Sequence, residues 1–369
     1  MEQRLFALLK ERRKEGRKCS SAYLKKMARV LMKEIDPSNT SFKASEGWFR
    51  KFVVRFNLSK RRKTNVKKES AEQRRPKIEA WHKKFRMFLK SPTPEGKTRA
   101  PAEEYAKWGR FQPHLRWNVD QVPLPFVTEM DSTYEEKGAD RVWIRMNGGP
   151  AAKKRFATLQ LCFRIKSYEG RHYRQMKPTI IFRGTGKRIK GAEKAAYDPR
   201  VSVAFQRKAW ADREFTNKWA REELLPFIEE ECDGAESMLI CDNLDAQTTD
   251  SFLNILRSKD ISRNLVPPET TENTQPVDGG LGQHSKVLIS QEMDRHLDVP
   301  EHLEQWENGT FSASEKRVLI TRWVGAAWEK IFAEDGPYKP NRYFEKTGCL
   351  LTADGSEDHK IQLEGIKDY

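Results

Sequence analysis

The sequence has few cysteines, no long apolar run and no metal-ligand motif. Its five cysteines are far apart and include no C-x-x-C pair, which argues against a disulfide framework and for reduced thiols inside the cell. The seven histidines show no zinc-ligand spacing with them. No run of about 18 apolar residues occurs, which excludes a membrane-spanning helix. Met1–Lys10 carries no apolar signal core, so we do not expect secretion.

The positive charge is concentrated at one end of the chain. The formal net charge is +16, and residues 1–100 contain 30 Lys and Arg against 10 Asp and Glu. The other 269 residues contain 39 against 43, so the first 100 hold the whole basic excess. A basic module beside a nearly neutral one is typical of a nucleic-acid-binding region attached to an enzyme or interaction domain. A solvated basic face or tail is the alternative.

The first 58 residues have the pattern of three helices. Apolar residues recur at helical spacing, and breaks at Gly16 and at 36–39 separate the segments. Ser45 is placed to cap the third helix. We expect the apolar stripe of that helix to form a small core, with basic residues on its other side; the stripe consists of Trp48, Phe49, Phe52, Val53 and Phe56.

The pattern changes near residue 100. A helix is expected over 69–90, and the Pro-containing stretch 91–96 ends it, so we place a domain boundary between Ser91 and Trp108. Short apolar runs alternate with helical stretches beyond this point, which predicts an α/β sheet of mixed direction. The expected strands are 117–119, 157–163, 179–182, 238–241 and 264–266, and the expected helices are 217–230, 248–258, 285–296 and 314–332.

Three aspartates have positions that favour chemistry. Asp120 and Asp242 each follow a short apolar run, and the carboxyl ends of strands are where an α/β sheet presents functional groups. Asp278 lies in a Pro/Gly-punctuated loop, and the 35 residues between Asp242 and Asp278 are enough for one helix, one strand and a return to the same edge. Other carboxylates nearby are Asp131, Asp245 and Glu272. Carboxylates gathered at one edge repel unless a cation joins them, and hard oxygen ligands suit Mg²⁺ or Mn²⁺.

Four segments together resemble the DDE superfamily endonucleases of the pogo/mariner branch: residues 118–126, 157–163, 241–247 and 267–278. The similarity extends over about residues 105–290. It implies a ribonuclease-H-like fold and, as the ancestral reaction, metal-dependent DNA cleavage and strand joining. By match of motif, Asp120 and Asp242 would share one metal ion and Asp278 would hold the other.

The N-terminal region resembles the centromere-protein-B-type helix-turn-helix through residues 42–52 and 58–64. Family members usually carry two such units in tandem, and one is visible here. The third helix would enter the major groove, and the basic run at 60–63 would hold the DNA backbone or act as a nuclear import signal. The DNA-binding residues expected on this basis are Lys43, Ser45, Glu46, Arg50, Lys51, Arg55, Lys60, Arg61, Arg62 and Lys63.

The expected organisation is an all-α helix-turn-helix domain followed by an α/β, ribonuclease-H-like mixed sheet with flanking helices. The domains are 1–65 (helix-turn-helix), 66–104 (helical, basic linker), 105–300 (DDE endonuclease) and 301–369 (helical extension with a polar tail). The function expected is that of a transposase acting on double-stranded DNA in the nucleus with Mg²⁺ or Mn²⁺. A homodimer would hold two DNA ends, although no dimer motif is visible. The alternative is a catalytically inactive, domesticated descendant that binds DNA in chromatin.

One further motif, the stretch 183–187, has glycines beside a lysine. Its spacing differs from that of a phosphate-binding Walker loop, so it is interpreted as a plain turn after a strand.

Overall fold

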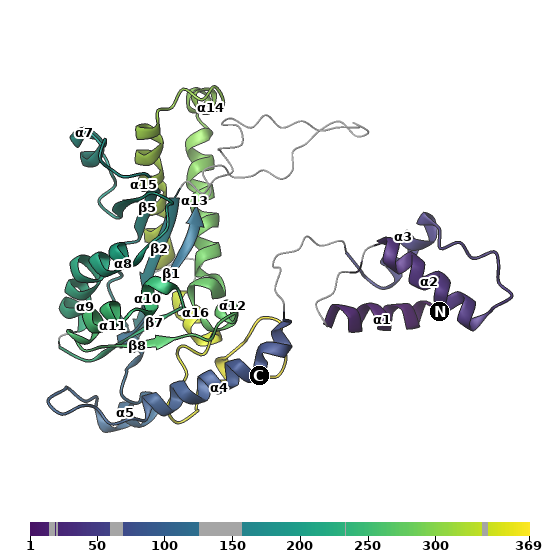
Figure 1. Ribbon diagram of the computed structural model, residues 1–369, viewed down its shortest axis with the longest axis horizontal. Coiled ribbons are helices and arrows are strands. Elements are labelled where there is room, and N and C mark those ends of the chain that lie inside the picture. The colour runs from purple at the N-terminus through teal and green to yellow at the C-terminus, as the bar shows by residue number, and fades with distance from the viewer. Residues whose placement is uncertain (15–18, 20, 60–68, 125–156, 233, 334–338) are drawn as a thin grey trace. The chain divides into compact units, whose positions relative to one another are not determined.

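A computed structural model describes residues 1–14, 19, 21–59, 69–124, 157–232, 234–333 and 339–369 (Figure 1). The chain divides into two compact units, Met1–Pro76 and Lys77–Tyr369. Within the described parts, no helix is long and apolar enough to cross a membrane.

The first unit contains three helices, α1 (Glu2–Lys14), α2 (Ser21–Ile35) and α3 (Glu46–Arg55). The three predicted helices are therefore confirmed. The Ser45 side chain caps α3 by accepting a hydrogen bond from the Trp48 backbone N–H at 3.2 Å. The aromatic stripe of α3 packs inward as expected, and Phe52 is fully buried. The buried core consists of Leu5, Leu24, Ala28, Leu31, Ala44 and Phe52.

The second unit is built on a six-stranded sheet with the order β6-β5-β2-β1-β7-β8. Its strands are β1 (Arg116–Leu124), β2 (Ala157–Phe163), β5 (Thr179–Arg183), β6 (Ser202–Gln206), β7 (Ser237–Cys241) and β8 (Ile261–Leu265). β2 is antiparallel to both neighbours, and the pairs β5–β6, β1–β7 and β7–β8 are parallel. Five strands therefore share one carboxyl edge, and this strand order is the ribonuclease-H-like topology that was expected.

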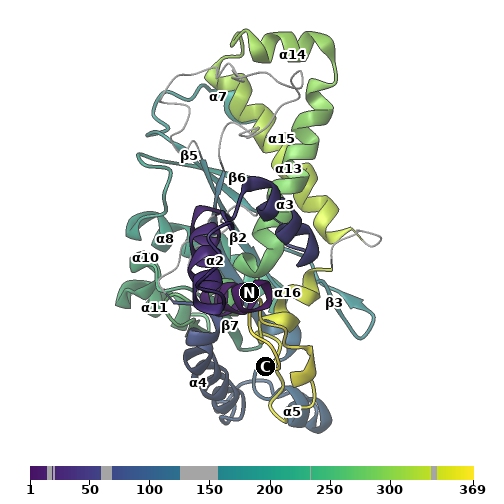
Figure 2. The same cartoon turned by 90° about the vertical axis from the view of Figure 1, so that its right-hand side faces the viewer.

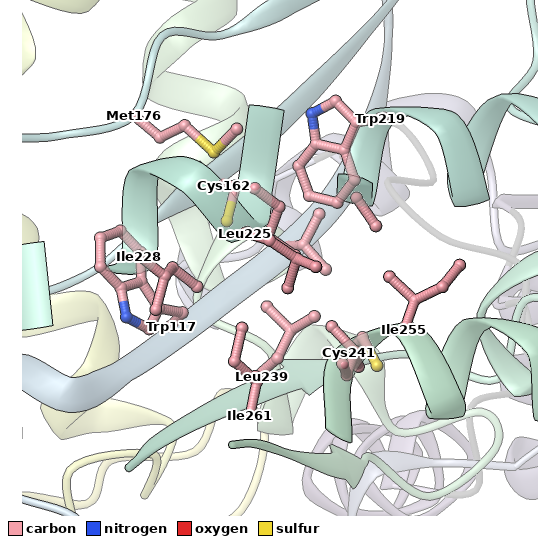
Figure 3. Close-up of a cluster of buried hydrophobic side chains, with 14 of the residues drawn as sticks. Trp117, Cys162, Met176, Trp219, Leu225, Ile228, Leu239, Cys241, Ile255 and Ile261 are labelled. Carbon is pink, nitrogen blue, oxygen red and sulfur yellow. The ribbon is translucent and has the colours of Figure 1, made fainter. Parts of the chain in front are cut away.

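Helices cover both faces of the sheet (Figure 1). On one face, α8 (Arg213–Trp219), η2 (Ala220–Leu224), α9 (Leu225–Cys232) and α11 (Asp250–Arg257) enclose the apolar core drawn in Figure 3. Trp117 and Val119 of β1 belong to this core. Since successive strand residues point to opposite faces, Asn118 and Asp120 lie on the other face of the sheet.

The remaining elements are short or lie after the sheet. They are α5 (Ala102–Trp108), η1 (Pro113–Leu115), the hairpin β3 (Ser167–Tyr168) and β4 (Arg171–His172), α7 (Gly191–Ala195), α10 (Asp245–Thr248), α12 (Thr271–Thr274), η3 (Val277–Leu281), α13 (Gly282–Leu297), α14 (Pro300–Glu307), α15 (Ala313–Phe332), α16 (Pro340–Lys346) and η4 (Asp358–Lys360).

Helix α4 (Ala71–Leu89) contains the division between the two units, which falls after Pro76. The sequence placed the boundary later, between Ser91 and Trp108. The physical reason is an apolar stripe that the linker interpretation did not weigh: Ile78, Trp81, Phe85 and Leu89 are all buried. The Trp81 indole N–H also donates to the Leu265 carbonyl at 3.0 Å. Most of α4 is therefore part of the second unit.

The C-terminal stretch that the sequence described as a polar tail also packs on this unit. Arg86 donates to the Thr352 carbonyl at 3.0 Å and pairs with Asp358. Lys107 pairs with Glu357 at 2.7 Å. Ion pairs with residues far away in sequence hold these charges in place, so the stretch predicted to be a polar tail belongs to the folded unit.

His82 on α4 is a buried, neutral base. Its Nε2 donates to the Thr347 carbonyl at 3.0 Å, and its Nδ1 lies 2.6 Å from the Tyr369 hydroxyl. Burial lowers the pKa of His82 from 6.5 to about 4, the hydrogen bond to Thr347 opposes this, and the charge of Arg86 lowers it further. The unfolded chain therefore binds a proton at higher pH than the folded chain does at this residue.

We expect the free energy of unfolding to decrease as the pH falls from 6.5 towards 4. Above the unfolded pKa His82 is neutral in both states, whereas below it protonation favours the unfolded state by up to about 3 kcal/mol. His114, whose pKa is also lowered to about 4, contributes in the same window. Urea unfolding at several pH values would measure this. A His82→Gln variant should have a shallower pH profile, and an unchanged profile would contradict the assignment.

Candidate active site and DNA-binding face

The register of the central strands brings Asp120 and Asp242 level with each other. β1 pairs in parallel with β7, and Asn118 is opposite Ile240. Two residues further along are Asp120 in β1 and Asp242, which directly follows β7. The sequence expected Asp120 at the end of its strand, but β1 continues to Leu124 along β2. The pairing of β1 with β7, in contrast, ends at Asn118. Asp120 and Asp242 therefore lie just beyond the paired part of these two segments.

Asn118 connects the three aspartate-bearing segments. Its buried side chain donates to the Ile240 carbonyl at 3.0 Å and accepts from the Val277 backbone N–H at 3.0 Å. Ile240 lies two residues before Asp242, and Val277 lies immediately before Asp278. A single amide therefore sets the distance between β1, β7 and η3. Sequence reasoning did not single out this residue, although a polar side chain inside an apolar strand is a recognisable signal.

Gln275 makes a second connection. It is fully buried, and its Nε2 donates to the Val119 carbonyl at 3.1 Å. Its side chain also forms a hydrogen bond with Asp120. Because both partners lie in β1, Gln275 holds the segment before Asp278 against the strand that carries Asp120.

The three carboxylates interact electrostatically. Burial raises the pKa of Asp120 well above its ordinary value, and the charges of Asp278 and Asp242 raise it further, while hydrogen bonds from Gln121 and Gln275 lower it. Burial and the charge of Asp278 likewise raise the pKa of Asp242, against a hydrogen bond from the Leu244 backbone N–H at 2.9 Å. Asp120 is 6% exposed, whereas Asp278 is open to solvent. Asp120 therefore interacts electrostatically with both other predicted aspartates, and Asp242 interacts with Asp278.

Two glycines allow η3 and α13 to approach this closely. Gly280 has a φ of 146°, a conformation that side chains rarely adopt, and lies against the Tyr343 ring. A Cβ on Gly282 would be 2.9 Å from a methyl carbon of Val122 on β1. The glycines after Asp278 therefore serve the close packing of this segment between β1 and α16.

The three carboxylates offer oxygen atoms, which are the ligands that hard divalent cations such as Mg²⁺ prefer. Their arrangement limits how many of them can bind the same ion. Within the described ranges, no three His, Cys, Asp or Glu side chains are arranged around a single point as the ligands of one ion. Mg²⁺ is commonly bound by one or two carboxylates, with water and substrate phosphate completing its shell. The three carboxylates therefore suit ions that are each held by one or two protein ligands.

The other carboxylates considered from sequence have different surroundings. Asp245 is 74% exposed and pairs with Arg213 at 2.6 Å, and this contact connects α10 with α8. Glu272 lies in α12 and is half-buried. Asp131 lies outside the described residues.

In the first unit, the exposed face of α3 carries Gly47, Arg50, Lys51 and Val54, which recur at helical spacing. Val54 is 77% exposed, an unusual position for a branched apolar side chain, and sequence reasoning did not select it. Lys43, just before α3, is also exposed. These residues form what we call the α3 face.

Three of the expected DNA-binding residues have partners within the unit. Ser45 caps α3. Glu46 accepts from Lys25 at 2.8 Å, and this ion pair lowers the pKa of Glu46. Arg55 pairs with Glu2. The basic run Lys60, Arg61, Arg62 and Lys63 lies outside the described residues.

Comparison with protein families matches two parts of the chain. Residues 1–62 match the Tc5 transposase DNA-binding domain, and residues 170–335 match the DDE superfamily endonucleases. The second match includes Asp242 and Asp278, and Asp120 precedes it. No curated protein sequence matches the chain.

Several solved structures are similar at low identity. The Mos1 transposase paired-end complex with left transposon end has 13% identity and a TM-score of 0.40, covering 87% of this chain and 80% of that one. The catalytic domain of Mos1 mariner transposase has 12% identity and a TM-score of 0.26, covering 75% of this chain and 99% of that one.

Proposed function

The chain is a transposase-like protein that combines a Tc5 transposase-type DNA-binding domain with a DDE superfamily endonuclease domain, and we propose that it cuts DNA and joins DNA strands with the help of divalent metal ions. The observation that supports this proposal is the electrostatic interaction of the three carboxylates, in which the charges of Asp278 and Asp242 both raise the pKa of Asp120.

The residues present define the roles. Asp120 in β1 and Asp242 directly after β7 would hold one Mg²⁺ or Mn²⁺ ion, and Asp278 would hold the other. Bound ions of this kind activate a water or a 3′-hydroxyl and stabilise the leaving oxygen of a phosphodiester. Asn118 and Gln275 are positioning residues, because they touch the backbone that carries the carboxylates and fix the spacing between them.

The experiment that tests this function is a cleavage assay on DNA that flanks the protein's own gene. The full-length protein should nick this DNA in the presence of Mg²⁺ and leave it intact in EDTA, and Mn²⁺ should substitute for Mg²⁺. DNA binding without any metal-dependent nicking would overturn the proposal.

That outcome would favour a second function, a DNA-binding protein without catalysis. One observation supports it: among the described residues, no three potential ligands surround a single point. In this case the second unit would serve as an interaction scaffold, and changes at Asp242 would have no effect on any activity of the protein.

The α3 face is the proposed DNA-reading surface of the first unit. A helix in the major groove reads base edges through side chains on one face, and an apolar side chain such as Val54 can contact a thymine methyl group. Arg50 and Lys51 are the cations of this face that lie on α3 itself, so they would contact phosphates or guanine edges.

We expect Arg50→Ala combined with Lys51→Ala to weaken binding of the full-length protein to duplex DNA by about 10- to 100-fold, because each charge-assisted contact contributes about 1 kcal/mol or more. Binding should weaken steeply as salt is increased, and the slope should be shallower for the variant. Fluorescence anisotropy over a salt series would measure both. The exposed Lys33→Ala on α2 is a matched control that should bind like the parent; a parent-like double variant would exclude the α3 face.

We also propose that the protein acts in the nucleus and that two copies hold the two DNA ends. The supporting features are the basic run at 60–63, which suits nuclear import, and a reaction that joins separate strands. Fluorescence microscopy of the tagged protein and sedimentation with and without DNA would test the two points.

A further inference from the structure

The residues around the end of α16 connect two of the segments that carry the aspartates. Helix α16 (Pro340–Lys346) lies beside the first turn of α13, which directly follows η3 (Figure 2). This part of the chain comes after residues 170–335, the stretch that matches the DDE superfamily endonucleases. We call residues 343–351 the support segment.

The support segment contacts the chain directly after Asp278. A Cβ added to Gly279 would lie 2.8 Å from the methyl carbon of Thr347, so this glycine and this methyl group are in close contact. Thr347 is 1% exposed, and its hydroxyl donates to the Tyr343 carbonyl at 2.7 Å. The hydroxyl is thus used at the end of α16, and the methyl is the part of the side chain that lies against Gly279.

A second contact involves the next residue of η3. Gly280 has a φ of 146°, and a Cβ added to it would lie 3.0 Å from a ring carbon of Tyr343. The hydroxyl of the same tyrosine shares a hydrogen bond with Nδ1 of His284 in the first turn of α13. Tyr343 therefore contacts both η3 and the helix that follows it.

The support segment is also bound to the strand that carries Asp120. Arg116, at the start of β1, donates to the carbonyls of Cys349 and Leu351 at 3.3 and 2.7 Å. The Cys349 thiol in turn donates to the Thr274 carbonyl at 3.1 Å, and both of these residues are fully buried. The support segment therefore joins β1 to the part of the chain that leads to Asp278.

Helix α4 packs against the support segment as well. His82 Nε2 donates to the Thr347 carbonyl at 3.0 Å, and a Cβ added to Gly348 would lie 2.2 Å from the same nitrogen. Thr347 thus contacts α4 through its carbonyl and η3 through its methyl group. His82 therefore limits how far this methyl can move away from Gly279.

We propose that Thr347 is a positioning residue for Asp278: its methyl group, held against Gly279, keeps the turn after Asp278 close to β1 and so sets the distance between this carboxylate and Asp120. Close-packed interiors transmit the loss of a single methyl group, because they hold little free space to absorb it. Residues that orient the ligands of a metal ion also affect its affinity without touching it. The inference rests on the proposed function, in which both aspartates bind metal ions.

The first test removes the methyl group and keeps the hydroxyl. In the full-length protein without metal, Thr347→Ser should increase hydrogen exchange at the Val277 N–H about fivefold, because this N–H is bonded to Asn118 only while the segment stays on β1. Mass spectrometry of peptides that contain Val277 would measure the exchange. Thr347→Val keeps the methyl group and removes the hydroxyl, so it should exchange like the parent.

The second test adds a methyl group on the other side of the contact. Gly279→Ala should increase exchange at Val277 about tenfold, because the new Cβ would overlap with the Thr347 methyl. Gly279→Ala combined with Thr347→Ser should exchange within about twofold of the parent, since the new Cβ occupies the space that the lost methyl leaves. The two changes should therefore compensate each other.

Metal binding gives a readout that a loss of stability alone would not change. The Mn²⁺ concentration that half-saturates the protein, measured from the electron paramagnetic resonance of free Mn²⁺, should rise about tenfold for Thr347→Ser and for Gly279→Ala. The double variant should bind like the parent. Thr321→Ser is the matched control: Thr321 is fully buried on α15, its hydroxyl donates to the Val318 carbonyl at 2.6 Å, and its loss of a methyl should leave Mn²⁺ binding unchanged.

Parent-like exchange in both single variants, additive effects in the double variant, or Mn²⁺ binding that none of the changes alters would overturn the proposal. The exchange measurement needs no metal, so it separates the two hypotheses. Compensating exchange in a protein that neither binds Mn²⁺ nor nicks DNA would contradict the proposed function alone. Mg²⁺-dependent nicking without compensation would contradict the role of Thr347 alone.

Discussion

Asp242→Asn should reduce Mg²⁺-dependent DNA cleavage by on the order of 1,000-fold, which corresponds to ~4 kcal/mol of transition-state stabilisation. Asparagine keeps the shape of the side chain and the hydrogen bond from the Leu244 N–H, but it removes the negative charge that attracts a cation. The chain should therefore remain folded and continue to bind DNA. Nicking rates of supercoiled DNA carrying the flanking sequence would measure the effect.

The matched control is Asp294→Asn, which removes the same charge from an exposed position on α13 and should cut like the parent. Duplex binding by both variants should be unchanged, since the α3 face is intact. If Asp242→Asn cuts at the rate of the parent, the catalytic assignment of the carboxylates is wrong.

Arg116→Met should lower the free energy of unfolding of the second unit by about 3–5 kcal/mol. Arg116 is fully buried at the start of β1, and burial lowers its pKa to about 9. Its guanidinium donates to the carbonyls of Trp108, Phe111, Cys349 and Leu351 at 2.9, 2.9, 3.3 and 2.7 Å. Removing it leaves these carbonyls without their donor, at about 1–3 kcal/mol for each group that finds no other partner.

Arg116→Met also removes a buried charge, which offsets part of this destabilisation. The expected loss of unfolding free energy is therefore smaller than the summed cost of four carbonyls without a donor. Urea unfolding followed by tryptophan fluorescence would measure it. Arg257→Met, at an exposed position on α11, should leave stability within about 0.5 kcal/mol of the parent. A comparable stability of Arg116→Met and Arg257→Met would show that the four carbonyls do not depend on the guanidinium.

Most helices and strands could be predicted because their signals are local. Ser45 followed by an aromatic stripe predicts the start of α3, and buried runs such as 157–163 and 238–241 correspond closely to β2 and β7. β6 was missed because its residues are only partly buried at the edge of the sheet, which weakens the apolar signal. β8 was expected three residues late, since the polar residues Ser262, Arg263 and Asn264 interrupt its apolar pattern after Ile261.

The roles of individual polar residues were harder to predict. Glu46 and Arg55 lie at positions of α3 that suit DNA contact, yet each pairs with a charge from another helix. Ser45 is used as a helix cap. In the C-terminal region, charges that resembled a solvated tail pair with α4 and α5. These partners are distant in sequence, so no local pattern indicates them.

The sequence by itself determined the helical N-terminal region and the mixed sheet, and it singled out Asp120, Asp242 and Asp278 as candidates, because charge distribution, apolar periodicity and motif spacing can be read along the chain. Only the tertiary structure decided that Asn118 and Gln275 connect the segments that carry the aspartates, and that Glu46 and Arg55 pair with charges from other helices. The physical reason is that strand register and loop anchoring depend on hydrogen bonds between residues that meet only after the chain has folded.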